Sequence, residues 1–241
     1  MPEADAIFIA LVIGSFVASV CNAAFSVGGA LIILATTSAV LPISAVVPIH
    51  STLLIGSTAT RVLLFWEHIN WNIARPFLLA SGFGAYFGAK LYFGLPEQFV
   101  AIAIAVLMLV AIWLPGVSWR PKLKHPWLIV GFAHSFLSTA FAYGAILQSI
   151  ILHTGLKRRE IVGTIGGCLT GMAVFKIASY VLNGFNYVPY LATILAAIVV
   201  SFFGTWIGRK LVDRISEKAF RLVFRVLITL TAIRLIYANL T

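Results

Sequence analysis

The feature that most limits how this chain can fold is a succession of long apolar runs, each bounded by charged residues, proline or glycine. A helix needs about 20 apolar residues to cross a bilayer, so a chain of 241 residues has room for roughly eight to ten crossings. Charged residues make up only 10% of the chain, whereas a soluble domain carries roughly a quarter. The sequence therefore predicts an all-α polytopic membrane protein and excludes a water-soluble globule.

The apolar runs fall into two series, and each series reads short, short, long, long, long. The runs cover 6–24, 28–41, 44–66, 73–93 and 97–115, and then 127–141, 144–154, 158–183, 187–211 and 217–240. Residues 116–126 form the long polar connector between the series and are rich in proline and basic residues. We predict a single transmembrane domain, 1–241, made of repeat 1 (6–115), a cytoplasmic connector (116–126) and repeat 2 (127–241).

Glycines and charges recur in the same order in both series, which indicates an internal duplication. The matched pairs include Gly56 with Gly171, Arg61 with Lys176, Gly84 with Gly204, and Gly88 with Gly208. The register drifts between these pairs, so the alignment needs small insertions. Some matches in so apolar a sequence arise by chance, but matched charges and glycines are harder to explain in that way.

The basic residues in the loops indicate how the repeats are oriented. If the two short runs of each repeat form a hairpin that returns to its starting side, nearly all basic residues near segment ends share one face, and Lys90 alone lies opposite. If each repeat instead has four full spans, the bias is modest. Basic loops stay cytoplasmic, so the hairpin arrangement predicts inverted repeats in the inner (plasma) membrane with both termini outside. Inverted repeats with broken helices are a common plan of secondary transporters.

The net charge of +10 does not require a nucleic-acid partner, because the basic residues cluster in these short loops. All seven acidic residues lie at segment ends or in loops. Carriers of cations and protons usually place a carboxylate within the membrane. The sequence therefore argues against a cation substrate.

Two glycine-containing breaks are the first candidate for a binding site. One lies around Ser26, Gly28 and Gly29, and its counterpart lies at Tyr143 and Gly144. A helix that begins inside the membrane leaves backbone N–H groups unpaired and attracts anions. The alternative is that these glycines only allow tight helix packing.

Arg61 and Lys176 are the second candidate, because each is a basic residue within a long apolar run. Such residues are costly in a bilayer and usually face a cavity or a partner. The alternative is that both extend to the headgroups. His50 and Thr164 lie at matching places in the two repeats, and Asn22 lies near the first break. The candidate substrate-binding residues are Asn22, Ser26, Gly28, Gly29, His50, Arg61, Tyr143, Gly144, Thr164 and Lys176.

Several short motifs resemble those of the TauE/SafE sulfite exporter family. They are VGGALIIL at 27–34, RVLLF at 61–65 followed by HINW at 68–71, VGT at 162–164, and FK at 175–176 leading to GFNY at 184–187. The resemblance extends over essentially the full length, although the second copy of the glycine stretch keeps only Gly144. It implies transport of sulfite, sulfonates or related sulfur-containing anions. Composition and spacing by themselves indicate only a small anion.

We therefore expect a secondary transporter, an exporter or a facilitator, that alternates access around a midplane site for a small sulfur-containing anion. An anion channel and a non-transporting assembly subunit of a membrane enzyme stay open as alternatives. The sequence has no P-loop, nucleotide fingerprint or metal-ligand spacing, so we expect no enzyme activity, no cofactor and no metal. The expected partners are the anion and the lipid bilayer, and a homodimer is one open oligomeric state.

Overall fold

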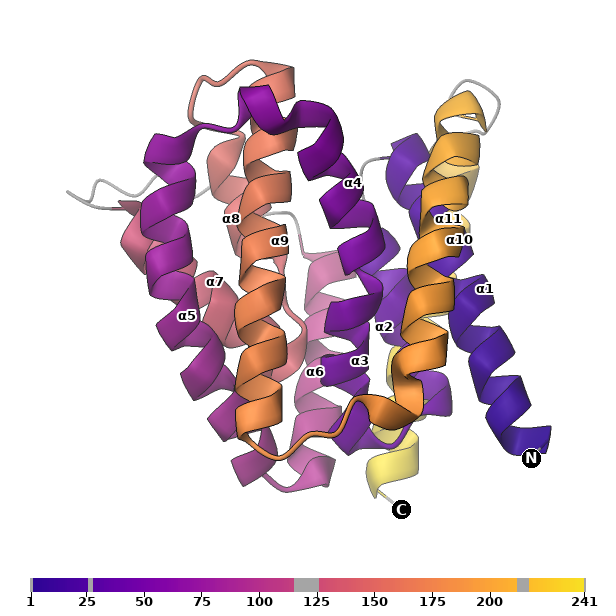
Figure 1. Cartoon of the computed structure of the whole chain (residues 1–241). Helices are drawn as coiled ribbons and strands as arrows, with labels where there is room; N and C mark the ends of the chain where they lie inside the picture. The colour runs from indigo at the N-terminus through magenta and orange to yellow at the C-terminus, as the bar shows by residue number, and fades with distance from the viewer. Residues whose placement is uncertain (1, 26–27, 115–125, 212–216, 241) are drawn as a thin grey trace. The chain divides into compact units, whose positions relative to one another are not determined.

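The computed structural model describes residues 2–25, 28–114, 126–211 and 217–240 (Figure 1). Within these residues every regular element is helical, which confirms the all-α prediction. The α-helices are α1 (Pro2–Phe25), α2 (Gly29–Val40), α3 (Ile43–Leu53), α4 (Ile55–Phe65), α5 (Trp71–Gly94), α6 (Glu97–Trp113), α7 (Pro126–Phe141), α8 (Ala145–Ile151), α9 (Arg158–Leu182), α10 (Leu191–Leu211) and α11 (Glu217–Leu240). Two short 3-10 helices, η1 (Trp66–His68) and η2 (Val188–Tyr190), precede α5 and α10.

The chain is a multi-pass membrane protein. Four stretches in the described residues are long and apolar enough to cross a bilayer, namely Ala4–Ala23, Ile43–His68, Arg158–Leu182 and Val188–Gly208. Large apolar side chains on these and neighbouring helices point outward, and Leu63, Leu79 and Phe202 are among the exposed ones. Such surfaces suit contact with lipid chains, which are as apolar as leucine.

The helix boundaries lie close to the ends of the predicted runs. The predicted breaks are also present, because α1 ends at Phe25 before α2, and α7 ends at Phe141 before α8. One long run differs from the prediction. The run 44–66 is interrupted at Leu54, between α3 and α4, whereas α9 is continuous over 25 residues.

The described chain forms two compact units. Unit 1 comprises Met1–Ser57, Pro96–Trp113 and Asn186–Thr241, and unit 2 comprises Thr58–Leu95 and Leu114–Phe185. Unit 1 therefore holds α1, α2, α3, α6, α10 and α11, whereas unit 2 holds most of α4 together with α5, α7, α8 and α9. Each unit combines helices from both predicted repeats.

In unit 2, α5 packs directly against α7 and α9 (Figure 1). Gly84 and Gly88 lie at the contact between α5 and α7. A Cβ atom on Gly84 would meet the carbonyl oxygen of Phe132, and one on Gly88 would lie 2.7 Å from the carbonyl oxygen of Phe136. The missing side chains therefore let the two helix backbones touch, as small residues commonly do in membranes.

In unit 1, α10 packs against α1 in the same manner. A Cβ atom on Gly204 would lie 2.7 Å from the carbonyl oxygen of Phe16, and one on Gly208 would meet the carbonyl oxygen of Val20. The two glycine pairs that match in sequence thus make equivalent backbone contacts, one pair in each unit.

Candidate functional site

The break between α7 and α8 in unit 2 is built around a residue with left-handed backbone. Ala142 has a φ of 57°, and its N–H donates to the carbonyl oxygen of Ser138 at 3.1 Å. A left-handed residue of this kind commonly closes the end of a helix. The break leaves carbonyl groups at the end of α7 and N–H groups at the start of α8 that need partners inside the protein.

Two side chains of α9 supply donors to the last turn of α7. The Nζ atom of Lys176 donates to the backbone oxygen of Ser138 at 2.9 Å and to its hydroxyl at 3.1 Å. One turn further along α9, the hydroxyl of Tyr180 donates to the backbone oxygen of Thr139 at 2.8 Å. Lys176 is only 3% exposed and Tyr180 is fully buried. The negative end of the α7 dipole favours a basic group at this place.

His134 provides the corresponding acceptor for α8. Its Nδ1 atom accepts the N–H of Leu147, the third residue of α8, at 3.1 Å. The imidazole is fully buried and its centre lies 5.8 Å from the ring centre of Phe77 on α5. No role for His134 is predicted from the sequence. Its position could have suggested one, because His134 lies one helical turn before Ser138 and shortly before the break.

Tyr143 and Gly144 lie within the break, as predicted. The N–H of Tyr143 donates to the backbone oxygen of Leu137 at 3.4 Å, and Gly144 is the N-cap of α8. A Cβ atom on Gly144 would lie 3.8 Å from Cε1 of His134. The helix that follows has only seven residues, so its dipole is small. The polar groups at this break are therefore mainly side chains.

The first break, in unit 1, uses glycine for conformation and for close packing. Gly28 is the N-cap of α2 with a φ of 96°, a left-handed backbone that glycine adopts without strain. Gly29 is buried, and a Cβ atom there would lie 2.7 Å from the backbone oxygen of Ala18 and 2.8 Å from Cβ of Asn22. Ser26 lies outside the described residues. Tight packing therefore explains why residue 29 is a glycine.

His50 contacts the helix that follows the first break. It is 2% exposed, and its Nε2 atom lies 3.1 Å from the backbone oxygen of Ala30 in the first turn of α2. His134 contacts the first turn of α8 in the other unit. Each short helix is therefore held near its start by a buried histidine.

Thr164 and Arg61 lie elsewhere in unit 2. The hydroxyl of Thr164 accepts the N–H of Asn70 at 2.9 Å, at the entry to α5. Arg61 on α4 is partly exposed and packs against α9, where a Cβ atom on Gly166 would lie 3.0 Å from its Cβ. Ten residues of helix, about 15 Å, separate Gly166 from Lys176. Tyr143 and Gly144 thus lie in the same break as the contacts of His134 and Lys176, whereas Thr164 lies nearer the start of α9 and Arg61 lies on α4 beside Gly166.

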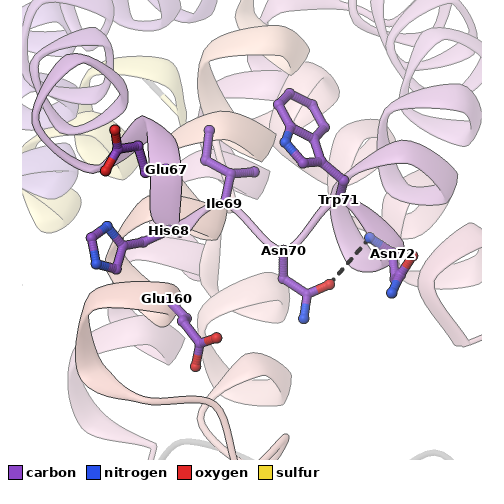
Figure 2. Close-up of a pocket in the computed structure, with 7 residues that line it drawn as sticks. All are labelled: Glu67, His68, Ile69, Asn70, Trp71, Asn72 and Glu160. Carbon is purple, nitrogen blue, oxygen red and sulfur yellow. Dashed lines mark hydrogen bonds between the residues drawn. The ribbon is translucent and has the colours of Figure 1, made fainter.

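A shallow cavity of about 350 Å³ lies near the start of α9 and contains none of the candidate residues. Figure 2 shows that Glu67 and His68, from the segment before α5, line this cavity together with Glu160 of α9. Glu160 uses its Oε2 atom to accept the N–H of Lys157 at 2.8 Å, so it caps α9. Two carboxylates disfavour an anion here. In the part of the chain that the structure describes, no group of three or more His, Cys, Asp or Glu residues is placed to hold a metal ion.

A comparison with protein families matches the model described as "Sulfite exporter TauE/SafE" to residues 11–235. The match covers all the described helices except parts of α1 and α11 at the chain ends. Comparisons with curated proteins and with solved structures gave no significant match.

Proposed function

Because this chain belongs to the TauE/SafE sulfite exporter family, we propose that it is a secondary transporter, an exporter or facilitator, for small sulfur-containing anions such as sulfite or organosulfonates. The observation that carries the proposal is the environment of Lys176. This side chain is buried in a long apolar helix and donates hydrogen bonds to two neutral oxygens of Ser138. Basic residues within a membrane mark ion and substrate pathways by default.

Among the acidic residues whose side chains the structure describes, none forms a hydrogen bond or an ion pair with Lys176. Asp5, Glu67 and Glu97 are exposed, and Glu160 caps its own helix. A buried charge without a fixed partner is costly. A mobile anion that binds beside Lys176 removes this cost, so the lysine favours an anionic substrate.

We assign supporting roles to the other candidates. In unit 2, Tyr143 and Gly144 lie in the break between α7 and α8, where Lys176 bonds the last turn of α7. Thr164 lies nearer the start of α9, and Arg61 lies on α4. In unit 1 we assign roles to Asn22, Gly28, Gly29 and His50 around the first break, and Ser26 belongs to the same sequence motif. Transport then proceeds by alternating access around a midplane site.

The flux of labelled sulfite and taurine into proteoliposomes tests this function. We expect saturable uptake and counterflow with the native protein, strong loss of flux with Lys176→Gln, and a weaker loss with Arg61→Gln. Lys90→Gln is the matched control, because Lys90 is an exposed lysine. Native flux in both the Lys176 and Arg61 variants would refute the role of these charges.

Two other functions predict different results. An anion channel gives flux that does not saturate and shows no counterflow. A non-transporting assembly subunit shows neither flux nor stabilisation by any anion. A ligand that binds only the folded state must raise its stability, so the melting temperature of the purified protein with sulfite, sulfate, thiosulfate and taurine separates this last class.

We also propose that the two repeats are inverted in the plasma membrane, with both termini outside and the connector 116–126 in the cytoplasm. The equivalent glycine contacts of α5 with α7 and of α10 with α1 support a duplicated architecture. Reporter fusions at the C-terminus and within the connector test the orientation. Reporters that locate both points on one side of the membrane would refute it.

A further inference from the structure

The hydrogen bond between Leu147 and His134 determines which ring nitrogen carries the proton. Because Nδ1 accepts the N–H of Leu147, it has no hydrogen of its own in the neutral imidazole. The hydrogen is then on Nε2, which becomes a donor. Nε2 is buried and has no hydrogen-bond partner among the residues that the structure describes. His134 therefore directs an unused N–H donor into the protein interior.

An unused buried donor costs free energy, because the group has lost its hydrogen bonds to water. The usual solution is an acceptor that is not part of the chain, either a water molecule or a ligand. The surroundings of His134 offer few alternatives. Phe77 and Leu147, which both contact the imidazole, belong to an apolar cluster of buried residues that also includes Val130 and Met172.

Lys176 contacts α7 one helical turn beyond His134. Ser138, which binds Lys176, follows His134 by one turn of α7, and residues four apart lie on the same face of a helix. As an ammonium group, Nζ has three N–H donors, and the structure accounts for two of them. His134 and Lys176 therefore each have one N–H donor that is available for a further hydrogen bond.

We propose that His134 Nε2 and Lys176 Nζ together bind the oxygens of the transported oxyanion in unit 2. This inference rests on the proposed function and deepens it, because it adds a residue to the site and names the ligand chemistry. The ligand presents at least two acceptor oxygens, as a sulfonate, sulfite or sulfate does. Chloride accepts hydrogen bonds at a single centre and offers no second acceptor atom, so we expect it to bind more weakly.

Two substitutions separate the binding role of His134 from its packing role. In His134→Asn, the amide can keep an acceptor near the position of Nδ1 for the N–H of Leu147, but the donor at Nε2 is lost. In His134→Gln, an amide nitrogen can occupy the position of Nε2, but the acceptor at Nδ1 is lost. We expect His134→Asn to melt close to the native temperature and to bind sulfate and methanesulfonate about ten- to hundredfold more weakly, since it loses a hydrogen bond to a charged ligand. We expect His134→Gln to melt lower and to keep most of its affinity.

Dissociation constants for sulfate, methanesulfonate and chloride, obtained from thermal shifts of the full-length protein, provide the readout. Ser15→Ala is the control, because the hydroxyl of Ser15 is also buried with no hydrogen-bond partner among the described residues, but lies on α1 in unit 1. We expect it to leave all three constants unchanged.

The possible outcomes distinguish this inference from the proposed function. If the native protein binds the oxyanions and His134→Asn binds them equally well, the role of His134 is refuted while anion transport stands. Equal losses in His134→Asn and His134→Gln refute the donor role, because packing then explains both. Chloride binding as tight as sulfate binding refutes the oxyanion class. If the native protein binds none of the three anions, the proposed function itself fails, and the inference fails with it.

Discussion

The Nζ atom of Lys176 lies 2.9 Å from the backbone oxygen of Ser138. Ser138 precedes the last residue of α7 by three positions and lies in an apolar part of the chain. The same oxygen also accepts the N–H of Ala142 at 3.1 Å. Ser138 therefore keeps a hydrogen bond when the lysine is removed. This arrangement allows the contribution of Lys176 to stability to be separated from its contribution to anion binding.

Lys176→Met is expected to abolish anion flux and to leave the melting temperature equal to or above the native value. The variant removes a buried basic group from an apolar site, and replacement of buried charge by an apolar side chain of similar volume is often neutral or stabilising. Thermal unfolding in detergent and proteoliposome flux measure the two effects. A loss of about 3 kcal/mol or more in unfolding free energy would instead indicate that Lys176 is mainly structural.

Gly84→Ala and Gly208→Ala should each destabilise the protein. The new Cβ atoms would meet the backbone oxygens of Phe132 and Val20, which cannot move aside as a flexible side chain does. We expect a loss of about 1–3 kcal/mol in each case, as for other overpacked contacts. Gly94→Ala is the control, because, apart from the adjoining residues and backbone of its own helix, no atom of the described chain lies within 4 Å of its Cβ position. Equal melting temperatures for all three variants would contradict the close backbone packing.

Ala142→Gly should raise the stability of the break between α7 and α8. Ala142 has a φ of 57°, and a left-handed conformation costs an L-residue roughly 1–2 kcal/mol. Part of that gain is lost, because glycine has more freedom in the unfolded chain. The measurement is the melting temperature, with Ala140→Gly in the regular part of α7 as a control that should lower it. A lower melting temperature for Ala142→Gly would argue against strain at this position.

Asn70→Ala should cost about 1 kcal/mol through loss of the N-cap of α5. The Oδ1 atom of Asn70 accepts the N–H of Asn72 at 3.1 Å, and both residues line the acidic cavity (Figure 2). Asn72→Ala removes an exposed side chain from the same cavity without removing the cap, so it should change stability by less than about 0.5 kcal/mol. Neither variant should alter anion flux, and a selective loss in Asn72→Ala would indicate that the cavity takes part in transport.

The helices and their ends were largely predictable from the sequence. Apolar runs, and the glycines and prolines that separate them, act over a few residues, so the breaks before Gly29 and Ala145 could be located without knowledge of the packing. The interruption at Leu54 was not predicted. Pro48 lies within α3 and Gly56 within α4, but similar residues occur inside continuous helices of this chain, such as Pro76 in α5.

The sequence by itself determined the membrane class, the order of the helices, the family and the unusual position of Lys176 within an apolar helix. Only the tertiary structure determined which groups form hydrogen bonds with Lys176 and His134. Lys176 bonds a residue 38 positions away and His134 bonds one 13 positions away across the break. Such partners depend on how α7, α8 and α9 pack together. Local patterns of apolar and polar residues record which face of a helix is buried, but they do not record which buried groups meet.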